Sequence, residues 1–270
     1  MKAGISSWSY RFYFDPGKTD LLSFLDDIKK QGAEAFEIFP SYVDKADPAG
    51  HLKKIAEKAK KLGLEISSLI AANDFARPTA AERAEQVARF KAWIEGAAGA
   101  GIGRMNVFTG YHVNGQDPEM EAARVIDAYR EVAPLAEKHK ILLCIENHSS
   151  VRSDGDGLMW LIQAIGSPCM RTNPDPTNFL PNFKLVDEKG REKIYQETEK
   201  IAPLMGNAHL KVSTFDASGN AEFVDVKRAL KIFKTAGYDG PVVLEYNGVG
   251  DPVDSMAKGV AQLKKVFKEI

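Results

Sequence analysis

Four residues that can bind a metal ion lie near the ends of apolar segments in the second half of the chain. They are Glu146 in LLCIENH, Asp175 in MRTNPDPTNF, His209 in NAHLKV and Glu245 in VVLEYNG. In a closed parallel sheet the ends of successive strands meet at one edge, so these side chains could converge on one point. Three carboxylates and one imidazole suit Mn²⁺, Mg²⁺, Co²⁺ or Zn²⁺, and the absence of cysteine from the set argues against a structural zinc. We therefore expect one divalent cation as the cofactor.

The same residues indicate a reaction. A six-coordinate ion with four protein ligands keeps two positions for the hydroxyl and carbonyl oxygens of a sugar. The cation could then act as a Lewis acid and stabilise an enediolate as a proton leaves the neighbouring carbon. Glu146 and Glu245, on opposite sides of the ion, are the candidates to take and return that proton.

Each of the four residues also has an explanation without a metal. Asp175 precedes Pro176 and could be a helix N-cap, Glu245 could pair with a lysine or arginine, and His209 could be a hydrogen-bonded core histidine. Glu146 is harder to explain in this way, because a carboxylate at the end of an apolar strand is costly to desolvate without compensating charges or donors. Four such residues on consecutive strands favour the metal site.

The elements that must position these residues alternate between strands and helices. Short apolar runs, separated by amphipathic stretches such as 81–98, 119–137 and 254–268, predict parallel βαβ units. Eight near-equal units in 270 residues, with no GxGxxG after the first strand, predict an α/β fold with one (β/α)8 TIM-barrel domain over residues 1–270. The strands are expected at 3–8, 34–39, 64–71, 103–109, 141–146, 169–174, 206–212 and 241–246.

Local signals mark where the helices begin and end. Asp47, Asp117 and Asp251 each precede a proline, which predicts an aspartate N-cap followed by proline in the first helical position. Thr79 and Glu82 have the spacing of a capping box. The glycines expected at helix ends are Gly32, Gly63 and Gly237.

The composition restricts the classes of partner. A net charge of −1, from 36 basic and 37 acidic residues, gives no field that would attract nucleic acid or an anionic membrane. Cys144 and Cys169 lie in apolar runs, which indicates reduced, buried thiols. No secretion signal precedes the first expected strand and no apolar run is long enough to span a membrane, so we expect a cytoplasmic protein. The outer helices suit either a monomer or a homo-oligomer.

Aromatic and polar residues near the ends of the first four strands suggest a polyhydroxylated small-molecule substrate. Trp8, Glu37 and Asn106 are the candidates to contact it in this half of the barrel. The segments after the fourth and sixth strands are longer than usual βα loops and are expected to cover the site. Their aromatic residues Tyr111, Phe179 and Phe183 could form an apolar lid, although the two phenylalanines could equally anchor the loop to the barrel rim.

The chain resembles the xylose isomerase-like TIM barrels, a family that includes sugar isomerases and epimerases, inosose dehydratases and apurinic endonucleases. The resemblance covers essentially the whole chain and rests on GISSW, E-N-H, D-P-x-N, H-L-K and V-L-E-Y in the first, fifth, sixth, seventh and eighth units. It implies that Glu146, Asp175, His209 and Glu245 bind one divalent ion. In the epimerase branch it also implies that Glu146 and Glu245 act as the acid and base.

Further contacts and departures concern the substrate. The resemblance implies that His148 and Lys211 reach the substrate, with a rim histidine and a salt bridge inside the barrel as the respective alternatives. Asn178 takes the place of a histidine that epimerases often have there, so it is a candidate substrate contact, but no named sugar carries over.

Members of this family have several different functions, and the sequence favours some of them over others. The DNA-repair branch needs additional histidines for three zinc ions, and this chain does not supply them. A metal-dependent isomerase or epimerase is therefore expected. A dehydratase of an inosose- or dehydroshikimate-like substrate and a non-catalytic carbohydrate-binding barrel remain as alternatives. The five histidines are His51, His112, His139, His148 and His209.

Overall fold

A computed structural model describes residues 1–148, 151–180 and 187–270. Within these residues, eight strands form one parallel sheet in the order β6-β5-β4-β3-β2-β1-β8-β7. Each expected strand is present, and most bounds agree within two residues. The strands are β1 (Lys2–Ser6), β2 (Ala35–Ile38), β3 (Glu65–Ile70), β4 (Arg104–Val107), β5 (Leu142–Glu146), β6 (Met170–Asn173), β7 (His209–Val212) and β8 (Pro241–Tyr246).

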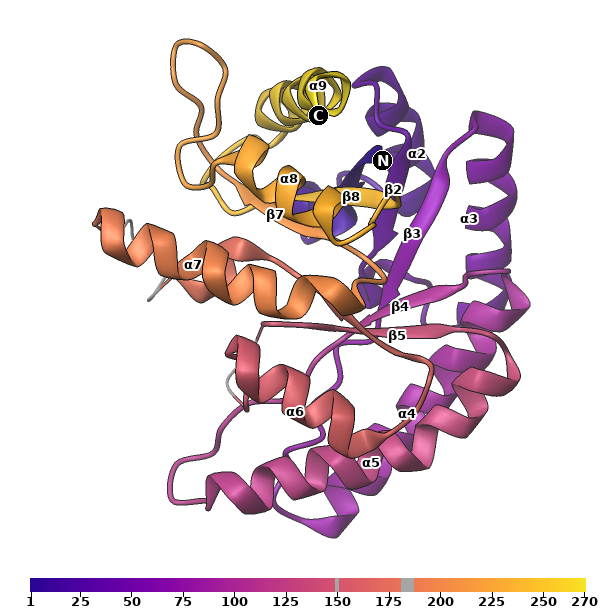
Figure 1. Ribbon diagram of the computed structural model, residues 1–270. Helices are drawn as coiled ribbons and strands as arrows, with labels where there is room; N and C mark the ends of the chain where they lie inside the picture. Colours follow the sequence, from indigo (N-terminus) through magenta and orange to yellow (C-terminus); the bar gives the residue numbers. More distant parts are fainter. Residues whose placement is uncertain (149–150, 181–186) are drawn as a thin grey trace.

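The two edge strands of this sheet, β6 and β7, are joined by backbone contacts that close the barrel. Thr172 forms an isolated parallel bridge with Met205, and its carbonyl oxygen accepts a 2.9 Å hydrogen bond from Gly206 N. His209 N donates to the carbonyl oxygen of Pro174 at 3.0 Å. The strands and the helices around them (Figure 1) confirm the expected (β/α)8 TIM barrel.

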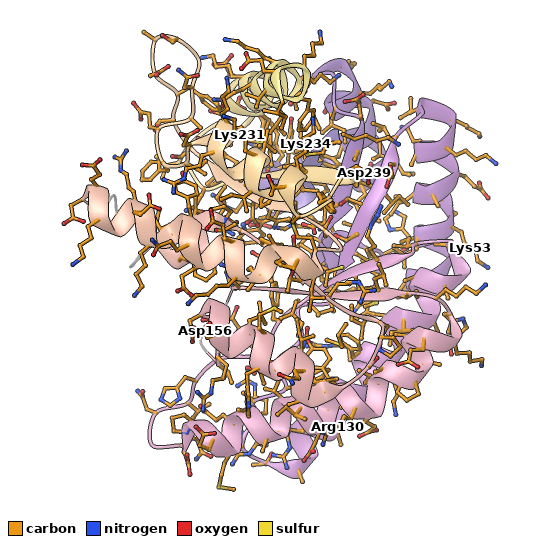
Figure 2. The ribbon with its side chains drawn as sticks, viewed as in Figure 1. Lys53, Arg130, Asp156, Lys231, Lys234 and Asp239 are labelled. Carbon is orange, nitrogen blue, oxygen red and sulfur yellow. The ribbon has the colours of Figure 1, made fainter. Side chains whose placement is uncertain are left out.

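Helices follow the strands and cover the outside of the barrel. They bury one apolar face each, such as Val87, Phe90 and Ile94 in the fourth helix. Figure 2 shows charged side chains such as Lys53, Arg130 and Lys231 on the outer surface. The α-helices are α1 (Arg11–Phe14), α2 (Leu21–Lys30), α3 (Pro48–Leu62), α4 (Ala80–Gly99), α5 (Pro118–Lys138), α6 (Gly155–Ile165), α7 (Glu188–Ile201), α8 (Val226–Thr235) and α9 (Val253–Glu269). In the described part of the chain, no helix has the length and apolarity that a membrane span requires.

The helix-start signals work as expected with one shift. Asp47 and Asp117 accept backbone N–H groups of the first helical turn, and the capping box of Thr79 and Glu82 is complete. α9, however, begins at Val253 with Pro252 as the N-cap. Asp251 therefore lies one residue before the position expected for it, although its side chain still accepts a 2.9 Å hydrogen bond from Val253 N.

Candidate metal centre

The barrel brings Glu146, Asp175, His209 and Glu245 together. Each offers one ligand atom, and these atoms all lie within 4.8 Å of one another. Glu146 ends β5, Asp175 follows β6, and the other two lie on the neighbouring strands β7 and β8. The first three are buried, and the Glu245 side chain is the most open of the set at 12 % exposed. Residues up to 99 positions apart in the sequence therefore lie together in one small polar site.

Asp175 serves both of the purposes that its sequence allows. Its Oδ1 accepts hydrogen bonds from Thr177 N at 3.0 Å and Thr177 Oγ1 at 2.6 Å, so it is the N-cap of the 3₁₀ helix η3 (Pro176–Phe179). Its Oδ2 faces the cluster. Asn147 fixes the Asp175 backbone by donating to its carbonyl oxygen and accepting from its N–H, at 2.9 and 2.8 Å. Sequence reasoning missed this role, although Asn147 lies within the E-N-H motif.

Two amides hold the Glu146 carboxylate from both sides. Asn106 Nδ2 donates to Oε2 and Asn178 Nδ2 donates to Oε1, each at 2.8 Å. Both asparagines were expected to contact substrate. Asn106 instead lies at 0 % exposure beneath the carboxylate, so its direct contact is with Glu146. Asn178 is only partly buried, and it brings η3 against the same carboxylate.

Lys211 occupies the centre of the carboxylate cluster. Its Nζ lies 3.2 Å from Glu146 Oε1, 2.7 Å from Asp175 Oδ2 and 2.8 Å from Glu245 Oε2. Burial opposes the charged lysine, but these carboxylates outweigh it and raise the pKa of Lys211 well above its ordinary value. Burial would likewise raise the pKa of Glu146, but Lys211 and His209 hold it far below the usual range. The expected contact of Lys211 with substrate is therefore replaced, in this structure, by a contact with the proposed ligands.

His209 faces the cluster with one nitrogen and a second carboxylate with the other. Its Nδ1 lies 3.6 Å from Glu146 Oε2 and is a buried atom without a hydrogen-bond partner among the described residues. Its Nε2 lies 2.9 Å from Glu37 Oε1. Burial lowers the pKa of His209, but Glu37 and Glu146 together raise it to about 10. The unpartnered nitrogen beside three carboxylates is a donor set that fits a divalent cation.

Glu37, another expected substrate contact, lies beneath His209. It is fully buried, and its oxygens accept hydrogen bonds from Ser6 Oγ at 3.0 Å and Ser68 Oγ at 2.6 Å. With both oxygens occupied and no exposed surface, the carboxylate is not available to a substrate.

The remaining expected contacts lie on the rim. Trp8 packs on Phe39 with ring centroids 4.9 Å apart, and it is only partly buried. His148 packs on Phe108 at 5.2 Å and meets Tyr111 edge-on at 6.3 Å. Tyr111 is 46 % exposed.

Of the two phenylalanines expected in the lid, the structure describes only Phe179. Phe179 packs against the core, which agrees with the anchoring alternative. Phe183 lies outside the described residues.

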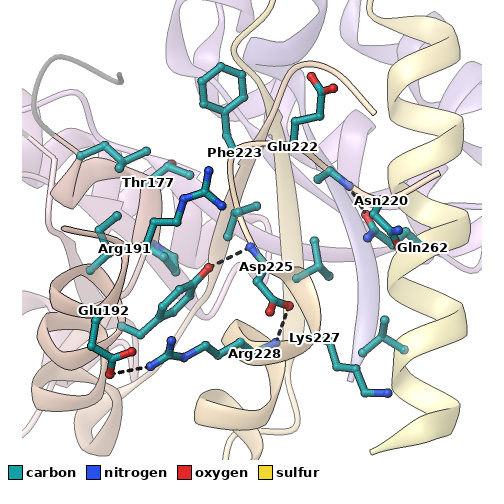
Figure 3. Close-up of a pocket in the computed structure, with 18 of the residues that line it drawn as sticks. Thr177, Arg191, Glu192, Asn220, Glu222, Phe223, Asp225, Lys227, Arg228 and Gln262 are labelled. Atoms are coloured by element: carbon teal, nitrogen blue, oxygen red, sulfur yellow. Dashed lines mark hydrogen bonds and ion pairs between the residues drawn. The ribbon is translucent and has the colours of Figure 1, made fainter. Parts of the chain in front are cut away.

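Two adjoining cavities lie near Lys211 and the segment that follows β6. A small cavity of about 220 Å³ reaches Lys211 and is bordered by the polar residues Thr177, Ser213 and Asn247. A larger cavity of about 1070 Å³ lies between α7, α8, α9 and the segment before α8 (Figure 3). The two share Thr177, Leu180 and Phe223 in their walls. Of the side chains in the charged cluster, Lys211 lines the smaller cavity, and the larger cavity adjoins it.

Comparisons with known proteins agree with this architecture. A protein-family model for the xylose isomerase-like TIM barrel matches residues 25–266. Among curated proteins, none matches the sequence.

Several solved structures share the fold. One of D-psicose 3-epimerase in the presence of D-fructose is 18 % identical with a TM-score of 0.73, covering 98 % of both chains. The 3-keto-D-glucoside 4-epimerase of E. coli is 16 % identical with a TM-score of 0.78, covering 98 % of this chain and 99 % of that one. An L-ribulose 3-epimerase is 18 % identical with a TM-score of 0.75, covering 99 % and 96 %.

Proposed function

The chain belongs to the xylose isomerase-like TIM barrel family, and we propose that within it the protein is a divalent-metal-dependent sugar isomerase or epimerase. The observation that carries the proposal is the convergence of three carboxylates and His209 Nδ1 at the mouth of the barrel. Two of these carboxylates, Glu146 and Glu245, come from different strands, β5 and β8. The similar structures of named sugar epimerases support the same class.

Glu146, Asp175, His209 and Glu245 would hold one Mn²⁺, Mg²⁺, Co²⁺ or Zn²⁺ ion. When bound, the ion would supply Lewis-acid polarisation of a substrate carbonyl. The two glutamates would transfer the proton at the adjacent carbon, one removing it and the other returning it. Proton return to the opposite face of the carbon gives an epimer, and return to the neighbouring carbon gives an isomer.

The surroundings of the two glutamates differ in a way that suits this division of labour. The oxygens of Glu146 accept from Asn106 and Asn178 as well as Lys211, which fixes its carboxylate in one orientation. Glu245 pairs with Lys211 and is the most exposed member of the cluster. We therefore assign Glu245 the greater freedom to approach a substrate carbon.

The small cavity gives polar space next to Lys211. It has a volume of about 220 Å³ and hydroxyl and amide groups in its walls. Trp8, His148 and Asn178 remain the proposed contacts on the rim, where an aromatic face and polar groups could hold a sugar.

Solvent-exchange measurements test the function. The metal-loaded protein would be incubated in D₂O with D-fructose, D-psicose, D-tagatose and L-ribulose, and the sugars would be followed by NMR. The proposal expects deuterium at a carbon next to the carbonyl together with a new epimer or isomer. A product that absorbs in the ultraviolet would favour the dehydratase, and the absence of exchange with a wider set of ketoses and inososes would favour a binding protein.

A variant pair ties the exchange to the site. Glu245→Gln should lower the exchange rate about 10²–10⁴-fold, because it removes a group that transfers the proton. Glu131→Gln is the matched control, since Glu131 lies on the exposed face of α5 and pairs with Lys91. Equal exchange rates in the wild-type protein and Glu245→Gln would contradict the assignment.

A further inference from the structure

We propose that Glu37 is a positioning residue that orients the imidazole of His209 so that Nδ1 is the metal-binding atom. The inference rests on the proposed function, since it concerns the same metal centre. It assigns a role to a carboxylate that no substrate can reach.

Serine side chains on the two neighbouring strands of the sheet hold the carboxylate of Glu37 in place. Ser6 of β1 and Ser68 of β3 are the register partners of Glu37 in β2, one on each side. Their hydroxyls donate to Oε2 and Oε1 of the carboxylate at 3.0 and 2.6 Å. Because three neighbouring strands place these groups at one level, Glu37 has a single orientation. Its Oε1 then lies 2.9 Å from Nε2 of His209, which reaches it from β7 across the barrel.

The contact between Glu37 and Nε2 determines which nitrogen of His209 can bind a metal ion. An ionised carboxylate only accepts hydrogen bonds, so Nε2 must carry a proton to satisfy Glu37. A metal ion that displaces the other proton of His209 then finds the lone pair on Nδ1. That atom is buried, faces Glu146 Oε2 at 3.6 Å and has no hydrogen-bond partner among the described residues. A metal ion is the partner for which this lone pair is correctly placed.

The expected contribution follows from comparable arrangements. A carboxylate that accepts the second N–H of a metal-binding histidine fixes its ring and raises its basicity, and loss of such a group weakens metal binding about 10–100-fold. A buried glutamate with a purely structural role would affect folding but would not select one nitrogen of His209.

Metal titration of three variants tests the inference. Calorimetric titration with Mn²⁺ should show binding about 10–100-fold weaker in Glu37→Leu than in the wild-type protein. Glu37→Gln should lose less, because its amide oxygen can still accept from Nε2, and it keeps the shape of the side chain should the leucine variant fail to fold. Glu121→Gln is the matched control, since Glu121 is also buried and bonded to a histidine, His112, but lies outside the centre. Its metal affinity should equal that of the wild-type protein.

A spectroscopic readout identifies the nitrogen. In protein labelled with ¹⁵N-histidine, addition of Zn²⁺ should shift the Nδ1 resonance of His209 while Nε2 keeps its proton. Unchanged metal affinity in both folded Glu37 variants, or a metal-induced shift at Nε2, would overturn the role of Glu37 and leave the metal-dependent function standing. Absence of metal binding by the wild-type protein would instead overturn the proposed function, and this inference with it.

Discussion

Lys211 and a divalent ion would compete for the same carboxylates. The ammonium group contacts Asp175 Oδ2 and Glu245 Oε2, and both carboxylates belong to the proposed metal-binding cluster. Without an ion, Lys211 supplies the positive charge that three closely spaced carboxylates require. Entry of a metal should therefore move the ammonium away from these oxygens. The small cavity that Lys211 borders provides space next to it.

Replacement of Lys211 tests this competition. In the metal-free protein, Lys211→Met should lower the free energy of unfolding by about 3–5 kcal/mol, because it leaves buried carboxylates without a counter-charge. Added Mn²⁺ should stabilise this variant more than it stabilises the wild-type protein, since no ammonium must be displaced. Chemical denaturation with and without metal measures both effects. Lys200→Met, which removes an exposed lysine of α7, should cause no measurable change; equal stabilisation of wild type and Lys211→Met by metal would contradict the idea of competition.

At the scale of single residues, the sequence shows which side chains come together at the site. It shows less well which partner each of these side chains contacts. Glu146 and Glu245 could be identified because a carboxylate in an apolar strand needs compensation. The position of Glu37 beneath the site could not be identified in this way. All four residues of its strand AFEI are buried, so no alternation of apolar and polar residues shows which side faces the barrel interior. The burial of Asn106 depends on the same information.

At the scale of elements, local signals predict helix starts and strand positions well. Asp47, Asp117 and the pair Thr79 and Glu82 act through contacts within four residues, so the sequence contains all the information. At the start of α9, Asp251 also accepts a hydrogen bond from Tyr13 OH at 2.7 Å, a partner 238 residues away. Such long-range contacts are absent from any local pattern.

Gly206 allows the segment before β7 to close against β6. A Cβ atom at this position would lie 2.7 Å from Cys144 Sγ and 2.9 Å from Arg171 Cβ, which is too close. Gly206→Ala should therefore destabilise the protein by about 1–3 kcal/mol through overpacking. Gly103→Ala is the matched control, because a Cβ there meets nothing within 4 Å. Thermal unfolding measures both variants. Equal midpoints would show that the contact between β6 and the segment before β7 tolerates the extra atom.

Glu65 links three strands at the opposite, N-terminal end of the barrel. Its carboxylate pairs with Lys2 of β1 and Arg104 of β4. Burial opposes its ionisation, but hydrogen bonds from these two cations hold the pKa of Glu65 below its ordinary value of 4.5. A lowered folded-state pKa gives stability that is present above the ordinary value and is lost as the pH falls through the folded-state value.

The pH dependence of a Glu65→Gln variant tests this link. Near neutral pH the variant should unfold with a free energy lower by about 1 kcal/mol, because the pairs are partly exposed. The difference should shrink below pH 4.5 and vanish once the wild-type carboxyl group is protonated. Urea unfolding over a pH series measures it. A difference that stays constant from neutral to acidic pH would show that charge does not cause the effect.

At the scale of the whole molecule, the proposed metal centre lies at the junction between β6 and β7, which we call the seam of the barrel. Of the eight strand junctions, it has the fewest backbone contacts. Seven pairs of strands form parallel ladders, whereas β6 and β7 are joined in the described structure by one isolated bridge and a few backbone hydrogen bonds. Asp175 follows β6 and His209 lies in β7, so a bound ion would connect the two sides of the seam. The centre would then contribute to the closure of the barrel as well as to the reaction.

Removal of metal should therefore act on this seam first. Metal at about 100 times its dissociation constant should stabilise the folded protein by about 2.7 kcal/mol, and EDTA should reverse this. The thermal midpoint should rise by several degrees, since about 2–4 °C accompany each kcal/mol in a protein near this size. Hydrogen exchange should slow most at the amides of Gly206 and His209, which donate across the seam. Protection spread evenly over all strands would show that the ion stabilises the fold without a particular role in closing it.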